Sequence, residues 1–156
     1  MKRQLPAYTA ALAAFAFAAI SLYWALGGTA AIDTIGGQLA SSGRAGAPIT
    51  LALVWAAVVL KLGVGLLALA LVQRWGRWIP RWMLLTAACT AAAVLTVYGA
   101  VQVIAEALVE TGMIRPAGEI DWYALRWHML LWDPWFLIWG LVLGTAALEY
   151  RRTRTA

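Results

Sequence analysis

The sequence predicts an all-α membrane protein, an antiparallel bundle of four transmembrane helices. Three observations support this fold class. The 156-residue chain is 63% hydrophobic and only 12% charged, well below the charged fraction of about 25% in an average soluble domain. Four long apolar stretches fill most of the chain, and its basic residues gather at their ends. A chain this short and apolar is expected to form one transmembrane domain over residues 1–156.

Each apolar stretch is long enough to cross a hydrocarbon core about 30 Å thick. A helix is expected within lipid because its backbone groups bond to one another. The predicted spans are residues 8–26, 49–73, 82–109 and 123–148.

The basic residues predict the orientation of these spans. They precede the first span, fill the turn between the second and third, and follow the fourth (Lys2 and Arg3; Arg74, Arg77 and Arg81; Arg151, Arg152 and Arg154). The other two loops contain one arginine each. Both termini are therefore expected to face the cytoplasm. The net charge of +5 follows from this topology, so we do not expect nucleic-acid binding.

Two ionisable residues lie near the middle of predicted spans. Lys61 is in the second span and Asp133 in the fourth, where a charge costs about 2.5–3.5 kcal/mol on insertion scales. At 1.5 Å per helical residue, they lie roughly 18 and 16 Å below the outer boundary. This match in depth predicts an ion pair between them.

A second match in depth joins Glu106, roughly 5 Å below the outer boundary, with Arg126, roughly 6 Å below it. In the third span, Tyr98, Gln102 and Glu106 follow one another at intervals of four, as one polar stripe. The predicted ligand pocket opens outward and is lined by Lys61, Tyr98, Gln102, Glu106, Arg126 and Asp133. Asp33, in the glycine-rich first outer loop, is a candidate lid residue. The alternative is that the buried pairs only fix helix register.

A second face of the fourth span combines one histidine with three of the ten tryptophans. His128, Trp132, Trp135 and Trp139 share a narrow face in a regular helix, on the side away from Arg126. This face predicts packing against a neighbouring helix or lipid. The alternative is a second apolar groove or a subunit interface with His128 as its polar tip.

Several kinds of chemistry are not expected from the sequence. Cys89 is the only cysteine and His128 the only histidine, so we predict no disulfide and no metal site. The glycine pairs lack the strand and helix context of nucleotide-binding motifs, and there is no Gly-x-Ser-x-Gly elbow. We therefore predict no cofactor, and catalytic residues cannot be assigned from the sequence.

Several short motifs resemble those of a family of small bacterial four-helix membrane proteins of unknown function. They are residues 23–28 (YWALGG) and 33–37 (DTIGG), Gly76-Arg77 with Pro80-Arg81, Tyr98-Gly99, and residues 126–128 (RWH) leading to 132–136 (WDPWF). The resemblance covers nearly the whole chain. It implies four spans in a bacterial inner membrane, and it implies no activity.

Three functions are consistent with this pattern. The first is a protein that binds or carries a small amphipathic or lipid-like ligand in the polar pocket. The second is a membrane enzyme that acts on a lipid or isoprenoid, with Glu106, Asp133 or His128 transferring protons. The third is a structural subunit of a homo- or hetero-oligomeric complex. Membrane lipids are the partners expected in every case.

Overall fold

The computed structural model of the protein describes residues 4–45 and 47–152, without the side chains of residues 38–40 and 44. Its long helices are α1 (Leu5–Ala25), α3 (Pro48–Ala70) and α4 (Arg81–Glu110). A fourth continuous helix, Trp122–Arg152, consists of α5 (Trp122–Trp127), the π-helical segment η4 (His128–Trp132) and α6 (Asp133–Arg152). The short elements are η2 (Ile32–Thr34), α2 (Gly37–Arg44) and η3 (Arg74–Trp78).

These four long helices lie where the four spans were predicted. Each is long and apolar enough to cross a membrane, which indicates a multi-pass membrane protein. Large apolar side chains on the outward faces of these helices are also consistent with a membrane: Leu12, Leu60 and Leu130 are 70, 69 and 72% exposed. Water penalises large apolar faces of this kind, whereas lipid accepts them. The prediction placed the end of the second span three residues beyond α3, which ends at Ala70.

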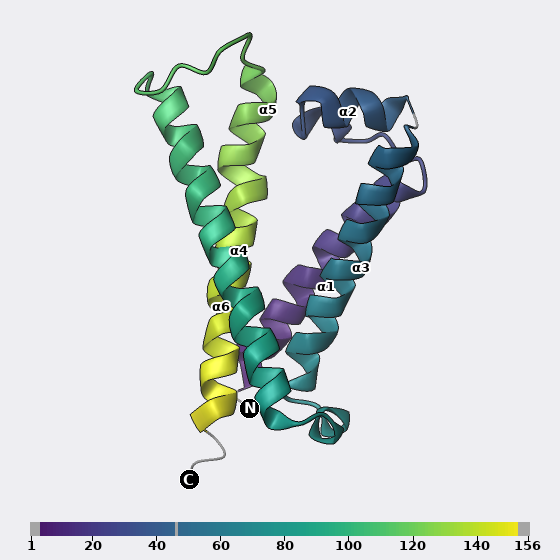
Figure 1. Ribbon diagram of the computed structural model, residues 1–156, viewed down its shortest axis with the longest axis vertical. Coiled ribbons are helices and arrows are strands. Elements are labelled where there is room, and N and C mark those ends of the chain that lie inside the picture. Colours follow the sequence, from purple (N-terminus) through teal and green to yellow (C-terminus); the bar gives the residue numbers. More distant parts are fainter. Residues whose placement is uncertain (1–3, 46, 153–156) are drawn as a thin grey trace.

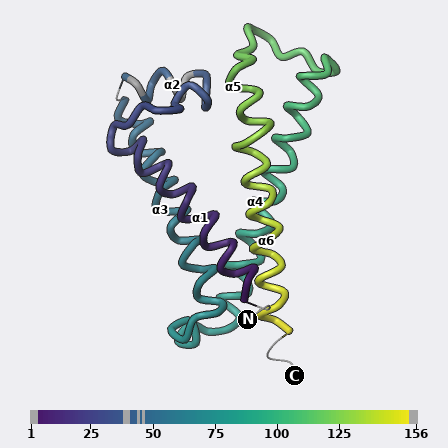
Figure 2. The backbone as a smooth tube through the Cα atoms, turned by 180° about the vertical axis from the view of Figure 1, so that it is seen from behind, coloured from purple at the N-terminus to yellow at the C-terminus, as the bar shows by residue number. Residues whose placement is uncertain are grey.

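The helices associate as two pairs, α1 with α3 and α4 with α6. The pairs meet mainly through α1 and α6, whereas α3 and α4 make few contacts. They lie close together at the end that holds the described termini and η3, and they diverge towards the two longer loops (Figure 1). The view from behind shows the same divergence (Figure 2). The pairs therefore share a core at one end and leave room between them at the other.

Small side chains build the shared core. Ala7, Ala10 and Ala14 of α1 are at most 2% exposed, and they belong to the same buried cluster as Trp139 and Leu143 of α6. Their small size lets the helices approach closely, which is how helices associate in lipid.

Glycine sets the contacts within each pair. A Cβ atom at Gly99 of α4 would clash with the backbone of Asp133 and Leu137 on α6. A Cβ at Gly65 of α3 would clash with the ring of Phe15 on α1. The pairing therefore follows from where the sequence places glycine on each helix.

The first long loop is folded against the helix ends, and it contains η2 and α2. The Trp24 indole N–H donates to the carbonyl of Ala30 at 2.9 Å, and the Ala30 N–H donates to the hydroxyl of Tyr23 at 3.2 Å. Gly36 has φ +65° and lies against Ala124 of α5, where a side chain would clash. These contacts hold the loop beside the start of the fourth long helix.

Candidate functional site

A cavity of about 340 Å³ lies between the two helix pairs. Its wall is mainly apolar and aromatic, with a few polar groups that face one another. It combines residues from α1, the first loop, α3, α4 and the fourth long helix: Phe17, Ser21, Trp24, Ile35, Leu53, Val54, Ala57, Lys61, Tyr98, His128, Trp132, Asp133 and Phe136. A largely apolar pocket with few polar groups is typical of a small-molecule site.

Lys61 forms the cationic part of this wall. Its Nζ donates to the hydroxyl of Ser21 at 2.6 Å and lies 3.6 Å from the centre of the Phe17 ring. Both partners are on α1, and both are at most 5% exposed. A hydroxyl dipole and a ring face stabilise the ammonium without neutralising it.

The predicted ion pair between Lys61 and Asp133 is wrong. Lys61 bonds to α1, whereas Asp133 Oδ2 lies 2.8 Å from Nδ1 of His128. The depth argument placed both residues at one level, and both do line the same cavity. It could not identify lateral neighbours, which depend on the pairing of α3 with α1 through Gly65.

The π-helical segment explains the position of His128. In a regular α-helix, side chains five residues apart point about 140° away from each other. Here the Asp133 N–H donates to the carbonyl of His128, and this five-residue turn brings the two side chains onto one face. Pro134 has no N–H with which to continue the regular pattern to Leu130, so it favours the wider turn.

The prediction that His128 lies away from the charged groups is therefore wrong. It assumed an unbroken α-helix through residues 123–148. Proline beside an intramembrane acidic residue was the sequence signal for an irregular turn at this point.

The first loop covers the cavity through its backbone. The carbonyl of Ile35 accepts a hydrogen bond from Nε2 of His128 at 3.2 Å. The indole N–H of Trp132 donates to the hydroxyl of Thr34 at 3.1 Å, and that hydroxyl donates to the carbonyl of Ala31. Asp33 directly precedes Thr34 in this loop and is exposed, and its role as a lid residue stays a prediction.

The predicted pair between Glu106 and Arg126 is also wrong. Arg126 bonds to Glu110 at 3.2 Å, and its side chain is 61% exposed. Glu110 lies one turn beyond Glu106 on α4, so a long arginine reaches it without entering the membrane interior. Glu106 instead lies 3.8 Å from Nδ1 of His128. Arg126 is thus placed outside the cavity, and Glu106 beside its histidine.

Of the polar stripe of α4, one residue lies in the wall of this cavity. Tyr98 lines the cavity, where its ring packs edge-on against Phe136 at 5.1 Å. The half-buried Gln102 does not appear in the wall.

The tryptophan face faces the interior of the molecule. Trp132 lines the cavity and stacks on Phe17 at 5.5 Å. The indole N–H of Trp135 donates to the carbonyl of Ala13, and Trp139 is 2% exposed in the shared core. Trp132 and Trp135 therefore pack on α1, which agrees with packing against a neighbouring helix; a groove or subunit interface on this face stays a prediction.

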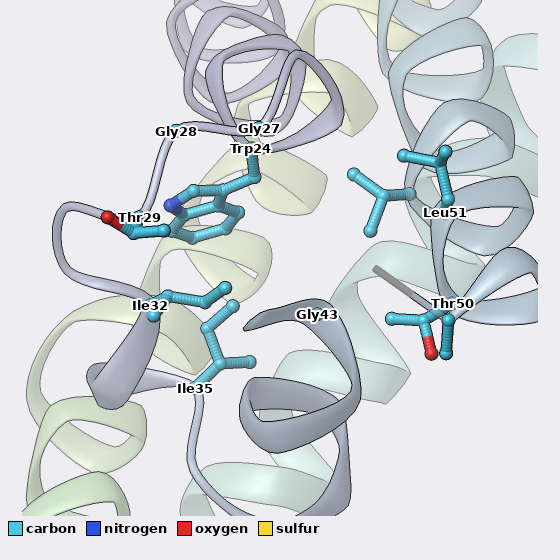
Figure 3. Close-up of a pocket in the computed structure, with 11 residues that line it drawn as sticks. Trp24, Gly27, Gly28, Thr29, Ile32, Ile35, Gly43, Thr50 and Leu51 are labelled. Carbon is cyan, nitrogen blue, oxygen red and sulfur yellow. The ribbon is translucent and has the colours of Figure 1, made fainter. Parts of the chain in front are cut away.

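A second cavity of about 210 Å³ lies beneath the first loop. Figure 3 shows Trp24, Ile32 and Ile35 pointing into it from one side, with Thr50 and Leu51 of α3 on the other. It shares Trp24, Ile35 and Val54 with the larger cavity, so the two spaces adjoin along one aromatic and two aliphatic side chains.

Three side chains with metal-ligating atoms meet beside the larger cavity. Glu106, His128 and Asp133 each place one such atom within 4.8 Å of the others. The prediction of no metal site considered only cysteine and histidine spacing. It missed these carboxylates because one is on another helix and the other reaches His128 only through the π turn.

One comparison with known proteins identifies a family. Neither the curated proteins nor the solved structures give a match to this chain. A family model described as "Protein of unknown function (DUF3995)" matches residues 14–143, which include every residue that lines the larger cavity. The chain therefore belongs to the DUF3995 family of proteins of unknown function.

Proposed function

We propose that this protein binds a small amphipathic ligand with an anionic head group, in a pocket that opens to the outer side of a bacterial inner membrane. Both termini are then cytoplasmic, as the distribution of lysine and arginine favours. The two longer loops lie at the opposite end of the molecule from the described termini (Figure 1). The cavity is bounded by the first of these loops.

The lack of an ion-pair partner for Lys61 among the described residues is the observation that carries this proposal. Its ammonium lies in a mainly apolar cavity, and none of the described residues forms an ion pair with it. A charge in the membrane interior is costly unless it is compensated. The head group of an anionic ligand supplies that compensation, and it leaves the Ser21 hydroxyl in place as a further hydrogen-bonding group.

The rest of the wall fits the apolar part of such a ligand. Phe17, Trp24, Trp132 and Phe136 present aromatic surfaces around the cavity, and aromatic side chains bury large apolar areas at low entropic cost. A single lysine set beside aromatic walls favours a molecule with one anionic head and one apolar body.

A charge comparison tests the proposal. Protein in zwitterionic nanodiscs is titrated with decanoate and with decyltrimethylammonium, which carry opposite head groups on the same chain. We expect decanoate to bind more tightly. Lys61→Met removes a hydrogen bond to a charged group, worth about 1.5–3 kcal/mol, so decanoate affinity should fall at least about tenfold.

Arg126→Gln is the matched control, because it removes an exposed outer cation that does not line the cavity. It should leave decanoate binding unchanged, and circular dichroism should show native helix content in both variants. Equal decanoate affinity in wild type and Lys61→Met would refute the proposal.

A further inference from the structure

Glu106, His128 and Asp133 form a compact cluster, called here the Glu-His-Asp cluster. Nδ1 of His128 lies 2.8 Å from Oδ2 of Asp133 and 3.8 Å from Oε1 of Glu106. The Asp133 side chain is 1% exposed and that of Glu106 is 12% exposed. Two largely buried carboxyl groups thus meet an imidazole whose side chain is 26% exposed.

The hydrogen bond at Nε2 fixes how His128 faces the carboxyl groups. A backbone carbonyl can only accept, so the contact with Ile35 requires the proton to be on Nε2. The neutral imidazole then presents the lone pair of Nδ1 to Asp133 and Glu106. A lone pair and two carboxylates repel one another unless a proton or a metal ion lies among them.

Among the described residues, no lysine or arginine side chain fills this role. Arg126 is engaged by Glu110, and the ammonium of Lys61 is directed to Ser21. The buried Oε2 atom of Glu106 receives no hydrogen bond from the described part of the chain. The cluster therefore has an excess of electron pairs and one buried oxygen without a donor.

We propose that the Glu-His-Asp cluster binds one divalent first-row transition-metal ion. Nδ1 of His128 and one oxygen each from Glu106 and Asp133 would be its protein ligands. An imidazole together with carboxylates suits Zn²⁺, Fe²⁺ or Mn²⁺, whereas Mg²⁺ and Ca²⁺ favour oxygen alone.

The spacing of the ligand atoms fits such an ion. Two atoms about 2.1 Å from a common metal lie roughly 3.0–3.4 Å apart, and the distances of 2.8 and 3.8 Å to Nδ1 lie on either side of that range. The bond from Nε2 to Ile35 is the kind of outer contact that orients metal-binding histidines. His128 and Asp133 also line the larger cavity, so the ion would be reached from it.

Titration of the full chain with Zn²⁺ and Mn²⁺ tests this proposal. For this experiment the protein is prepared without a histidine tag, and bound metal is removed with a chelator. Binding is then measured by calorimetry in nanodiscs. We expect one Zn²⁺ per chain and weaker binding of Mg²⁺ and Ca²⁺. Glu106→Gln and Asp133→Asn each remove one ligand charge, so the Kd for Zn²⁺ should rise at least tenfold.

Glu110→Gln is the matched control, since it removes a carboxylate one turn away on the same helix. It should leave the Zn²⁺ affinity unchanged. Substitution by Co²⁺ should give visible absorption bands that are altered in Glu106→Gln, a readout that a loss of stability alone does not produce. If the buried Asp133→Asn variant fails to fold, Glu106→Gln decides the matter.

Two outcomes would overturn the proposal. One is the absence of stoichiometric Zn²⁺ or Mn²⁺ binding by folded wild-type protein, which would mean that protons alone compensate the cluster. The other is the same affinity in Glu106→Gln as in Glu110→Gln. Decanoate binding at Lys61 is measured separately, so failure of either proposal is distinguishable from failure of the other.

Discussion

At the scale of single residues, the two central charged residues line one cavity but have different partners. Lys61 is held by a hydroxyl and an aromatic face of α1. Asp133 is held by His128, which a loop carbonyl holds in turn. Neither residue bonds to the other, which is the condition for the separate anion and metal sites proposed above.

One prediction at this scale concerns the cover of the cavity. Trp132→Phe keeps a ring against Phe17 but removes the hydrogen bond to Thr34. We expect the free energy of unfolding to fall by about 1 kcal/mol and amide exchange in the first loop to become faster. Hydrogen–deuterium exchange should show this change.

The control for this prediction is Trp127→Phe, at an exposed indole of the same helix. Its exchange profile should match that of wild type in the first loop. Equal exchange of that loop in Trp132→Phe and wild type would show that the bond to Thr34 does not hold the cover.

At the scale of elements, the π-helical segment creates the site. It adds the residue that lets His128 and Asp133 share a face while α5 and α6 remain one continuous helix. Turns of this kind are rare and occur often at functional sites. Here the proline that follows Asp133 supplies a local reason for the turn.

Pro134→Ala tests this role. Alanine restores the missing N–H, so the helix can return to regular α geometry and move His128 away from Asp133. We expect unchanged helix content by circular dichroism but at least about tenfold weaker Zn²⁺ binding, because a charge-assisted contact worth about 1.5–3 kcal/mol is lost.

Pro116→Ala, in the exposed loop between α4 and α5, is the control. It should bind Zn²⁺ as wild type does. If Pro134→Ala binds Zn²⁺ with wild-type affinity, the proline is not what maintains the π turn.

At the scale of the whole molecule, the divergence of two tight helix pairs makes the cavity (Figure 2). Each pair is held by a close approach at glycine, and small alanines join the pairs at one end only. The apolar outer faces are left for lipid.

A matched pair of glycine substitutions tests this packing. Gly99→Ala places a Cβ against the backbone of α6, and overpacking of this kind costs about 1–3 kcal/mol. We expect a lower Tm and weaker decanoate binding. Gly63→Ala, on α3 with open space around it, should leave the Tm the same or higher. A Tm of Gly99→Ala equal to that of wild type would contradict the close approach of α4 and α6.

The predictability of the site differed from residue to residue. Lys61, Tyr98 and Asp133 were found as cavity residues from charge and spacing. Arg126 was misplaced because its length lets it reach Glu110 at the surface. His128 was misplaced because its position depends on one non-α turn, and helical-wheel geometry has no means of including such a turn.

The sequence by itself determined the four apolar spans, their approximate ends and the presence of costly charges at their centres. These properties depend on composition and on the fixed rise of a helix, which each segment carries alone. Only the tertiary structure decided which helices pair and which charge meets which partner. Those choices depend on small differences in close packing between glycine, alanine and aromatic surfaces on separate segments, and on the π turn that rotates one helix face by a fraction of a turn.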